Sequence, residues 1–496
     1  MKNYKNILLA IFSLLLFSGC SSDLLDLEPQ GEKLEANYYT TVEEAYMALT
    51  AVYDVTTWSY PWGMSWYCTL ASAGDDANAG GESALDRIEY FEPDEFNISV
   101  TNDGPLNLWI KYYAGIYRAN VIQGIELEGD VIDVYKAEAK FLRAFFYFDL
   151  VRFFGDVPII TSVLTPEEYG QTRSPASEVY DLIIQDLQDA IPLLPEKPGE
   201  GSSNLGRATK GAAKALLGKV YLFLEMWPEA ETQLGEVIDS EIYDLETPYD
   251  SIFDLSWEHS TESVIEFNYT DIRGTSWDGP YGYNEGNLDI QLMGIRDLVM
   301  DPALPEALDP GWGFVKPTQD LVDVFLAEND SLRLYSNVIF GDSLLAQGAT
   351  FDDDFGFEGF FRKKYSMKVT DKPTQSQQYA QDYLNMRYAD VILMYAEAAY
   401  RNNKPGIAVY NINLVRARAD LADISPSGTA IFDAIVNERR LELALEGIRY
   451  WDVIRWGMAD TEFGPLGYDP ATKGLWPIPQ EEILRTGGTL TQNEGY

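Results

Sequence analysis

The sequence predicts a mainly α-helical protein in which long irregular loops and a few short strands connect tetratricopeptide-like helix pairs. Amphipathic runs with capping residues recur along the chain, and two pairs of runs carry small residues at helix-pair spacing. Loops rich in Gly, Asp, Asn, Ser, Tyr and Trp separate these runs. Since no low-complexity linker divides the sequence, residues 41–496 are expected to form one body, with an N-terminal part at about 41–260 and a C-terminal part at about 261–496.

Helices are expected where apolar residues recur every three or four positions between capping signals. Thr41 and Glu44 have the spacing of a capping box, and Ser174 and Pro175 provide an N-cap and a first-turn proline. The expected helices are residues 41–57, 106–126, 134–154, 174–191, 208–225, 228–239, 379–401, 405–420 and 431–455, and a short strand is expected at 263–269.

Two of these helix pairs carry the tetratricopeptide signal. Gly218 precedes Ala230 by the interval expected for such a pair, and Ala396 precedes Ala408 by the same interval. Small side chains at these positions let two antiparallel helices approach closely. Residues 141–153 are a third candidate for the first helix of a pair.

The first residues have the pattern of a lipoprotein signal peptide. Two lysines precede an apolar run at residues 7–17 that is too short to cross a bilayer comfortably, and small residues lead to Cys20. We expect residues 1–19 to be removed, Cys20 to be acylated, and residues 20–40 to form a tether to the membrane. The alternative is an ordinary secretory signal with a cysteine there by chance.

Charge and histidine content argue against several function classes. The chain has 36 Lys and Arg against 79 Asp and Glu, a formal net charge of −43, so nucleic acids and anionic lipid surfaces are not expected partners. The one histidine, His259, lies in a polar stretch and is expected to be an ordinary loop residue, which argues against zinc hydrolases and Ser-His catalysis. Cys68 is expected to be buried as a small apolar residue.

Five segments together resemble the SusD/RagB family of cell-surface nutrient-binding lipoproteins. They run in the family's order and cover nearly the whole chain after the signal peptide. The segments are Cys20 followed by LDLEPQ at 25–30; AEAKFLRA at 137–144 continuing to FFGDVP at 153–158; RYADVILMYAEA at 387–398 with INLVRAR at 412–418; NERRLEL at 437–443 with GIRYWDVIRW at 447–456; and LWPIP at 475–479 with QNEGY at 492–496.

This resemblance implies a helical body with four tetratricopeptide-like units and a looped, ligand-facing side. It also implies lipid anchoring on the exterior of the outer membrane, where family members act as a lid on a SusC-like TonB-dependent transporter. The implied ligand is an oligosaccharide, or a peptide as in some members, and the family is not known for catalysis. No cofactor is expected.

Sugar capture needs flat apolar surfaces for the C–H faces of the rings and polar groups for the hydroxyls, and tryptophan and tyrosine combine the two. Aromatic residues are concentrated in several of the loops. The candidate ligand platforms are Trp58, Tyr60, Trp62, Trp66, Trp277, Tyr281, Tyr283 and Trp312, each with loop anchoring as the alternative role. The tryptophans of helical and family-signature segments are expected in the core: Trp109, Trp227, Trp451, Trp456 and Trp476.

Asp75, Asp76 and Asn78 form an acid and amide cluster in a loop whose position resembles the family's ligand-contacting loop. Such groups can accept hydrogen bonds from sugar hydroxyls. Asp76, Asn78 and Gly81 also fit three positions of an EF-hand calcium loop, but Arg87 stands where that loop needs an acid. A structural calcium is therefore a minor alternative, and a solvated turn is another.

Three glutamates recur every four residues on one helix face, where alone they would repel one another. Arginines on the same stretch and on a neighbouring helix can neutralise them. The residues are Glu438, Glu442 and Glu446 with Arg439, Arg440, Arg449, Arg416 and Arg418. We expect an ion-pair network that fixes helix register in preference to an active site.

Two other function classes remain as alternatives. A glycoside hydrolase needs two carboxylates across a cleft, and although the chain has many acids, no local motif nominates a pair. A purely structural surface protein is less consistent with aromatic-rich loops. The sequence therefore favours a non-catalytic, oligosaccharide-binding lipoprotein, and its negative charge favours neutral glycans over anionic ones.

Overall fold

The computed structural model describes residues 39–58, 66–245, 248–271, 286–373 and 378–496. The signal peptide and Cys20 therefore lie outside the described residues, as does all but the last part of the expected tether. Within the described ranges no helix is both long and apolar enough to cross a membrane.

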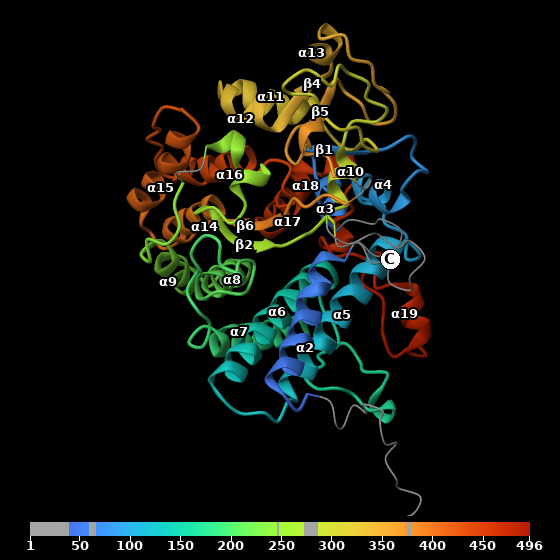
Figure 1. The fold of residues 1–496 in the computed structure, drawn as a ribbon, viewed down its shortest axis with the longest axis vertical. Coiled ribbons are helices and arrows are strands. Elements are labelled where there is room, and N and C mark those ends of the chain that lie inside the picture. Colours follow the sequence, from blue (N-terminus) through green and yellow to red (C-terminus); the bar gives the residue numbers. More distant parts are fainter. Residues whose placement is uncertain (1–38, 59–65, 246–247, 272–285, 374–377) are drawn as a thin grey trace, which may run out of the picture.

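The N-terminal part of the body is a layer of packed helices (Figure 1). These are α2 (Val42–Asp54), α5 (Asp103–Gln123), α6 (Asp130–Phe154) and α7 (Ala176–Ala190). Asn102 caps α5 by accepting a 2.7 Å hydrogen bond from the Gly104 amide. Helix α7 begins one residue later than its expected proline position because the Ser174 backbone pairs with Val157 instead of capping the helix.

Two helix pairs have the close packing that the small residues predict. They are α8 (Lys210–Phe223) with α9 (Trp227–Ile238), and α14 (Tyr388–Arg401) with α15 (Pro405–Arg418). A Cβ on Gly218 would lie 2.6 Å from the Leu234 side chain, so only glycine permits this approach of α8 and α9. Ala230, Ala396 and Ala408 are fully buried. The prediction of both pairs is confirmed.

Two expected helices were wrong in part. Residues 383–387 of the expected helix 379–401 form strand β6 (Tyr383–Arg387), which pairs antiparallel with β2 (Ser263–Phe267). The expected helix 431–455 is split into α16 (Ala430–Glu442) and α17 (Arg449–Arg455), because Leu445 and Gly447 adopt left-handed backbone with φ of 61° and 72°.

The remaining elements are short and lie mainly between the two helical regions and at the far end of the body (Figure 1). The strands are β1 (Ala77–Gly80) paired with β3 (Phe314–Pro317), and β4 (Val338–Phe340) paired with β5 (Phe360–Arg362). The helices are α3 (Trp66–Ser72), α4 (Ile88–Asp94), α10 (Asp289–Met293), α11 (Gln319–Ala327), α12 (Ser331–Asn337), α13 (Gly341–Ala346), α18 (Ala459–Glu462) and α19 (Gln480–Arg485).

The core joins the N-terminal helices to the C-terminal segments through aromatic contacts. The Phe153 ring packs edge-on against Trp451 and Trp476, at centroid distances of 4.8 and 4.7 Å. Trp109 is also buried, whereas Trp227 and Trp456 are half-buried, so the core prediction is confirmed for three of the five tryptophans. Cys68 is fully buried, as expected.

The predicted ion-pair network exists and extends beyond its helix. Glu442 pairs with Arg387, Arg418 and, at 3.0 Å, Arg333. Glu438 pairs with Arg333 at 2.7 Å and with Arg416 at 3.2 Å. Arg333 and Arg387 were not anticipated as partners, because they lie far from the glutamates in the sequence.

The arginines of α16 and α17 pair with acids outside the group of three glutamates. Arg439 pairs with Asp390 at 2.8 Å and with Asp452 at 2.7 Å, so it ties α16 to α14 and α17. Arg440 and Arg449 turn toward the loop at residues 75–76. The network therefore fixes the mutual positions of several elements and not only the register of one helix.

The replacement Arg387→Met should lower the free energy of unfolding by about 3–5 kcal/mol, because Glu262, Glu442 and Glu446 would share a buried site without this guanidinium. Urea unfolding at neutral pH measures the effect. The matched control is Lys473→Met, which removes an ion pair with Glu494 whose side chains are 69% and 71% exposed and should leave stability nearly unchanged. Equal losses in the two variants would contradict a dominant role for the network.

Candidate functional site

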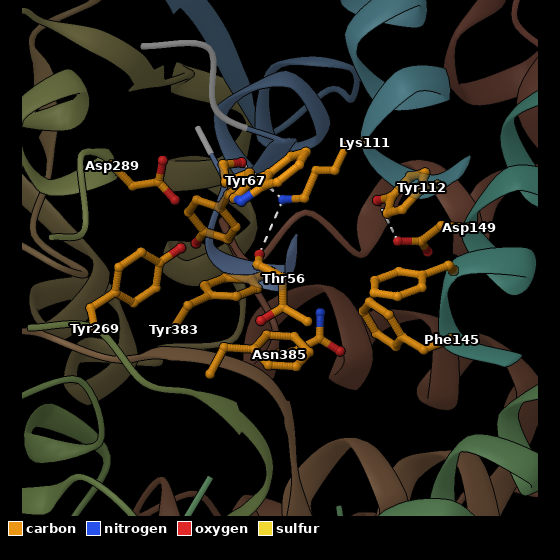
Figure 2. Close-up of a pocket in the computed structure, with 13 residues that line it drawn as sticks. Thr56, Tyr67, Lys111, Tyr112, Phe145, Asp149, Tyr269, Asp289, Tyr383 and Asn385 are labelled. Atoms are coloured by element: carbon orange, nitrogen blue, oxygen red, sulfur yellow. Dashed lines mark hydrogen bonds between the residues drawn. The ribbon is translucent and has the colours of Figure 1, made fainter. Parts of the chain in front are cut away.

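A pocket lies where the segments of the expected ligand-facing side meet. Aromatic and polar side chains from both halves of the chain line it, as Figure 2 shows. The lining residues are Thr56, Trp58, Tyr67, Lys111, Tyr112, Phe145, Phe146, Asp149, Phe267, Tyr269, Asp289, Tyr383 and Asn385. Aromatic faces beside hydroxyl, amide and charged groups are the chemistry that sugar rings require.

The pocket is too small to hold a sugar ring. Its cavity of about 30 Å³ is the volume of roughly one water molecule. Its walls are rigid, since the Tyr112 hydroxyl donates a 2.6 Å hydrogen bond to Asp149 and the rings of Tyr67 and Tyr383 are in edge contact at 5.1 Å. The pocket is therefore the floor of a candidate site and not the whole of it.

Residues that flank the predicted ligand loops surround this floor. Trp58 precedes residues 59–65, Tyr269 lies just before residues 272–285, and both line the pocket. The Asn287 amide donates a 2.7 Å hydrogen bond to the Tyr379 carbonyl, so these two described residues, which follow 272–285 and 374–377 in the sequence, are neighbours. The candidates Tyr60, Trp62, Trp277, Tyr281 and Tyr283 lie outside the described residues, and Trp66 is described only as the first residue of α3.

Trp58 is held in place at the edge of the pocket. Its indole Nε1 donates a 2.8 Å hydrogen bond to Asp54, and the Arg118 guanidinium lies over the ring, 4.7 Å from its centroid. The Lys111 ammonium donates to the carbonyl oxygens of Trp58 at 3.0 Å and Thr56 at 3.1 Å. A half-buried indole with a fixed orientation is a suitable platform for a sugar face.

Trp312 lies beside the short helix α10, which also carries Asp289 of the pocket. Its amide donates a 2.8 Å hydrogen bond to the Gln291 carbonyl, and its own carbonyl accepts from Arg296 at 3.3 Å. The ring is half-buried and packs against the main core. Trp312 is thus anchored to the body on the side of α10, and its contact with ligand stays a prediction.

The acidic loop residues have protein partners. Asp75 pairs with Arg449 through hydrogen bonds of 2.7 and 2.8 Å, and Asp76 accepts a 2.8 Å hydrogen bond from Arg440. Burial opposes ionisation of Asp75, but the Arg449 guanidinium outweighs burial and lowers the pKa of that carboxyl. These contacts attach the loop to α16 and α17.

Asn78 and the candidate calcium loop also differ from expectation. Asn78 belongs to strand β1, and its amide donates to the Gly356 carbonyl at 3.0 Å and to Glu358 at 2.9 Å. Because Asp76 faces a guanidinium and the chain continues as a strand, these residues do not have the geometry of an EF-hand loop. Their ligand contact stays a prediction that nothing in this arrangement favours.

A larger groove, not anticipated from the sequence, adjoins the pocket. It has a volume of about 670 Å³ and lies between α2, Arg118, the turn at residues 203–207 and the end of β2. Thr56 and Phe267 line both the groove and the pocket, so the two are adjacent. We refer to it as the α2 groove.

The α2 groove has its own aromatic and cationic surface. The guanidinium of Arg207 lies 5.6 Å from the ring centroids of both Tyr46 and Tyr135, and the two rings are 5.8 Å apart. Tyr46 and Met47 are about half exposed on α2. This outward aromatic face of an otherwise amphipathic helix is the sequence signal that could have identified the groove.

Comparisons with known proteins show which family this chain resembles. Residues 345–496 match the model of the SusD family, and residues 25–222 match a family described as starch-binding associating with outer membrane. Two SusD-like proteins of Formosa agariphila, P38 and P2, are each 27% identical to this chain over the full length of both proteins.

Solved structures match over almost the whole chain. A laminarin binding SusD-like protein is 33% identical, with a TM-score of 0.84 over 92% of this chain and 99% of that one. Surface glycan-binding protein A from Bacteroides thetaiotaomicron, solved in complex with laminarihexaose, is 26% identical with a TM-score of 0.80, over 91% of this chain and 99% of that one.

The replacement Lys111→Met should alter the pH dependence of stability. Burial lowers the pKa of Lys111 to about 8, against an ordinary value of 10.5. Between these values the native protein has released a proton that the unfolded chain still holds, so this lysine makes the protein more stable as pH rises from 8 to 10.5. Across this pH range, the melting temperature of the wild type should rise relative to that of Lys111→Met. A constant difference would show that Lys111 does not titrate there.

Proposed function

Since this chain belongs to the SusD family, we propose that it captures a neutral oligosaccharide of the laminarin type at the cell surface. The observation that carries the proposal is the similarity to the laminarin binding SusD-like protein, which extends over 92% of the chain. The captured oligosaccharide then passes to a SusC-like TonB-dependent transporter, for which this protein serves as the lid. A lipid on Cys20 holds it on the outer face of the outer membrane.

The described residues support capture of an uncharged chain of sugars. Trp58 offers an oriented indole, and the pocket and the α2 groove add tyrosine rings, hydroxyls and amides around it. The net charge of −43 disfavours polyanionic glycans. We place the ligand over Trp58 and the pocket floor.

Capture is proposed to occur without cleavage. Hydrolysis of a glycosidic bond requires two carboxylates that can act as acid and base on opposite sides of it. In the described pocket, Asp149 accepts hydrogen bonds from Tyr112 and Arg152, so its carboxylate is already committed to the protein. The similar proteins with solved structures are also named for binding.

The replacement Trp58→Ala should weaken laminarihexaose binding by about tenfold, roughly 1.4 kcal/mol, because the ring supplies a flat contact for a sugar face. Isothermal titration calorimetry measures affinity, and assay of new reducing ends in the same samples should find none. The matched control is Trp227→Ala, a half-buried tryptophan at the start of α9 that should leave affinity unchanged.

Three results would contradict this proposal. Wild-type protein that binds peptides but not laminarihexaose would have a different ligand class, and new reducing ends at enzyme-like rates would make the protein a hydrolase. Unchanged affinity in a folded Trp58→Ala protein would remove Trp58 from the site.

The replacement Cys20→Ala should abolish incorporation of labelled fatty acid and release the protein from the membrane fraction of its host. Cys68→Ala is the control, because Cys68 is fully buried and should not be acylated. Fractionation after an alkaline wash measures the release. Continued labelling of Cys20→Ala would place the lipid elsewhere or rule out this anchor.

A further inference from the structure

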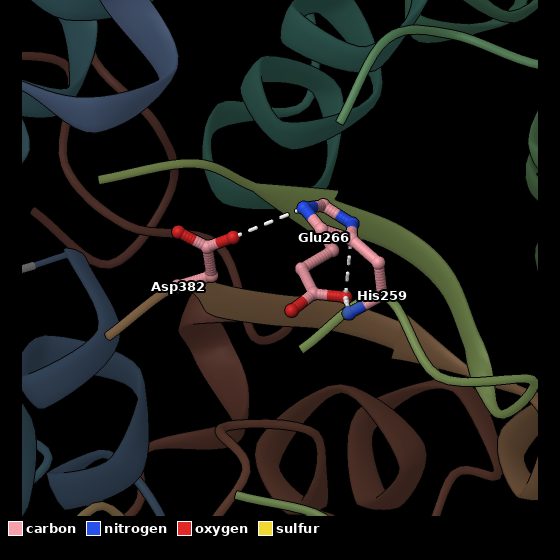
Figure 3. A group of neighbouring side chains, drawn as sticks. All are labelled: His259, Glu266 and Asp382. Atoms are coloured by element: carbon pink, nitrogen blue, oxygen red, sulfur yellow. Dashed lines mark hydrogen bonds and ion pairs between the residues drawn. The ribbon is translucent and has the colours of Figure 1, made fainter. Parts of the chain in front are cut away.

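The single histidine of the chain lies in a buried group of carboxylates. His259 follows the short 3₁₀ turn Leu255–Trp257, Glu266 is in β2, and Asp382 directly precedes β6, the strand that pairs with β2 (Figure 3). The potential ligand atoms of the three residues lie within 4.8 Å of one another. His259 lies in a turn, as expected, but it is partly buried beside two carboxylates, because the β2–β6 pairing brings residue 382 near residue 266.

The imidazole lies between the two carboxylates. Its Nε2 is 3.2 Å from Asp382 Oδ2, and its Nδ1 is 3.5 Å from Glu266 Oε2. The backbone of His259 is left-handed, with a φ of 55°, and its amide donates a 2.9 Å hydrogen bond to Glu266. The Tyr269 amide donates to Asp382 Oδ1 at 2.7 Å, which leaves Oδ2 directed at the imidazole.

Among the described residues, the carboxylates of this group lack the lysine and arginine partners that the acids of the arginine network have. Glu266 and Asp382 are 7% and 5% exposed, and Glu258 accepts a 2.8 Å hydrogen bond from the Asp382 amide. Among the described residues, no lysine or arginine is within ion-pair distance of these three acids. Lys197 is near, but its ammonium donates to the Ser263 carbonyl at 2.7 Å.

In the arginine network, by contrast, each buried glutamate has at least two cationic partners. Here Glu266 and Asp382 share a single imidazole, which can supply at most one positive charge, so part of the desolvation penalty of the two carboxylates stays unbalanced. A cation in their midst would remove that penalty. A small cavity of about 30 Å³, lined by His259, Glu266, Ser263 and Lys197 among others, adjoins the group and can admit one ion or water.

The geometry suits a small divalent ion bound by nitrogen and oxygen. Zinc bonds to histidine nitrogen and carboxylate oxygen at about 2.0–2.2 Å, which in a tetrahedral site separates the two ligand atoms by roughly 3.4 Å. His259 Nε2 and Asp382 Oδ2 are 3.2 Å apart, close to that separation. The Asn268 amide nitrogen is 2.9 Å from Nε2, and the same amide rotated by half a turn would present its oxygen as a fourth ligand.

We propose that His259 Nε2 and Asp382 Oδ2 bind one zinc ion, with Asn268 or a water molecule as a further ligand and with Glu266 joining once its carboxylate turns from Nδ1 toward the ion. The ion would attach the loop at residues 258–260 to the β2–β6 pair. Asn268 lines the α2 groove, and Tyr269, one residue further, lines the pocket. The zinc site would therefore stabilise the wall between the pocket and the α2 groove. The proposal does not depend on whether the ligand of the protein is a glycan.

Titration of the metal-stripped protein tests the site directly. The wild type should bind one equivalent of Zn²⁺ and melt at a higher temperature with it. Co²⁺ in place of Zn²⁺ should give the visible d–d absorption of a four-coordinate site containing nitrogen. His259→Asn should bind Zn²⁺ at least tenfold more weakly, and Asp382→Asn should do the same. Glu494→Gln, which alters an exposed ion pair with Lys473, is the control and should bind as the wild type does.

The cobalt spectrum of the wild type keeps the test decisive even where a variant does not fold. No Co²⁺ absorption and no Zn²⁺-dependent rise in melting temperature would overturn the proposal. So would stabilisation by Ca²⁺ alone, or Zn²⁺ binding that is unchanged in a folded His259→Asn protein, because both would place the cation away from the imidazole.

Discussion

The carboxylate of Glu442 is the point at which distant parts of the chain are joined. Arg333 of α12, Arg387 of β6 and Arg418 of α15 all pair with it. Burial alone would raise the pKa of Glu442, but the charges of the three guanidinium groups outweigh burial and hold it well below the usual range. Since the loss of any partner would leave an unbalanced charge in the interior, these elements can adopt only one mutual arrangement.

This network also positions the candidate site. Arg387 ends strand β6, and Tyr383 and Asn385 of the same strand line the pocket. Arg362 of β5 donates to the Leu445 carbonyl and to the hydroxyl of Tyr67, whose ring contacts that of Tyr383. The pocket floor is thus attached to the rigid helical body through two buried arginines. A rigid base with variable loops is the arrangement in which ligand specificity can change without loss of the fold.

Features that depend on local sequence were predictable, and features that depend on distant partners were not. The small residues at 218, 230, 396 and 408 identified both helix pairs, because close helix approach is recorded in the residues of the pair itself. Residues 383–387 were assigned to a helix because their partner strand lies more than a hundred residues earlier. The break between α16 and α17 depends on left-handed backbone at Leu445, which no local signal marks.

In the candidate site, too, local features were predictable and features that depend on distant partners were not. Aromatic loops and the position of Trp58 could be identified from composition, but Asp75 and Asp76 look like ligand contacts until Arg449 and Arg440 appear beside them. The residues around an acid in a solvated loop look the same as those around an acid whose arginine partner lies more than 350 residues away. The local sequence therefore does not reveal these ion pairs. The α2 groove was missed because its walls come from α2, Arg118 and residues 203–207, which meet only in the folded chain.

The placement of the arginines indicates where the excess negative charge of the protein lies. Many of the cations that enter the net charge of −43 are buried beside carboxylates, as Arg333, Arg387 and Arg439 are. Ion pairs of this kind cancel in the interior, so the excess acids lie mostly at the surface, where they repel anionic ligands. Among the described residues, Glu266 and Asp382 differ from the acids of the arginine network, since they face an imidazole in place of a guanidinium. The same electrostatic reasoning thus underlies both proposals, a neutral glycan at the surface and a metal cation in the interior.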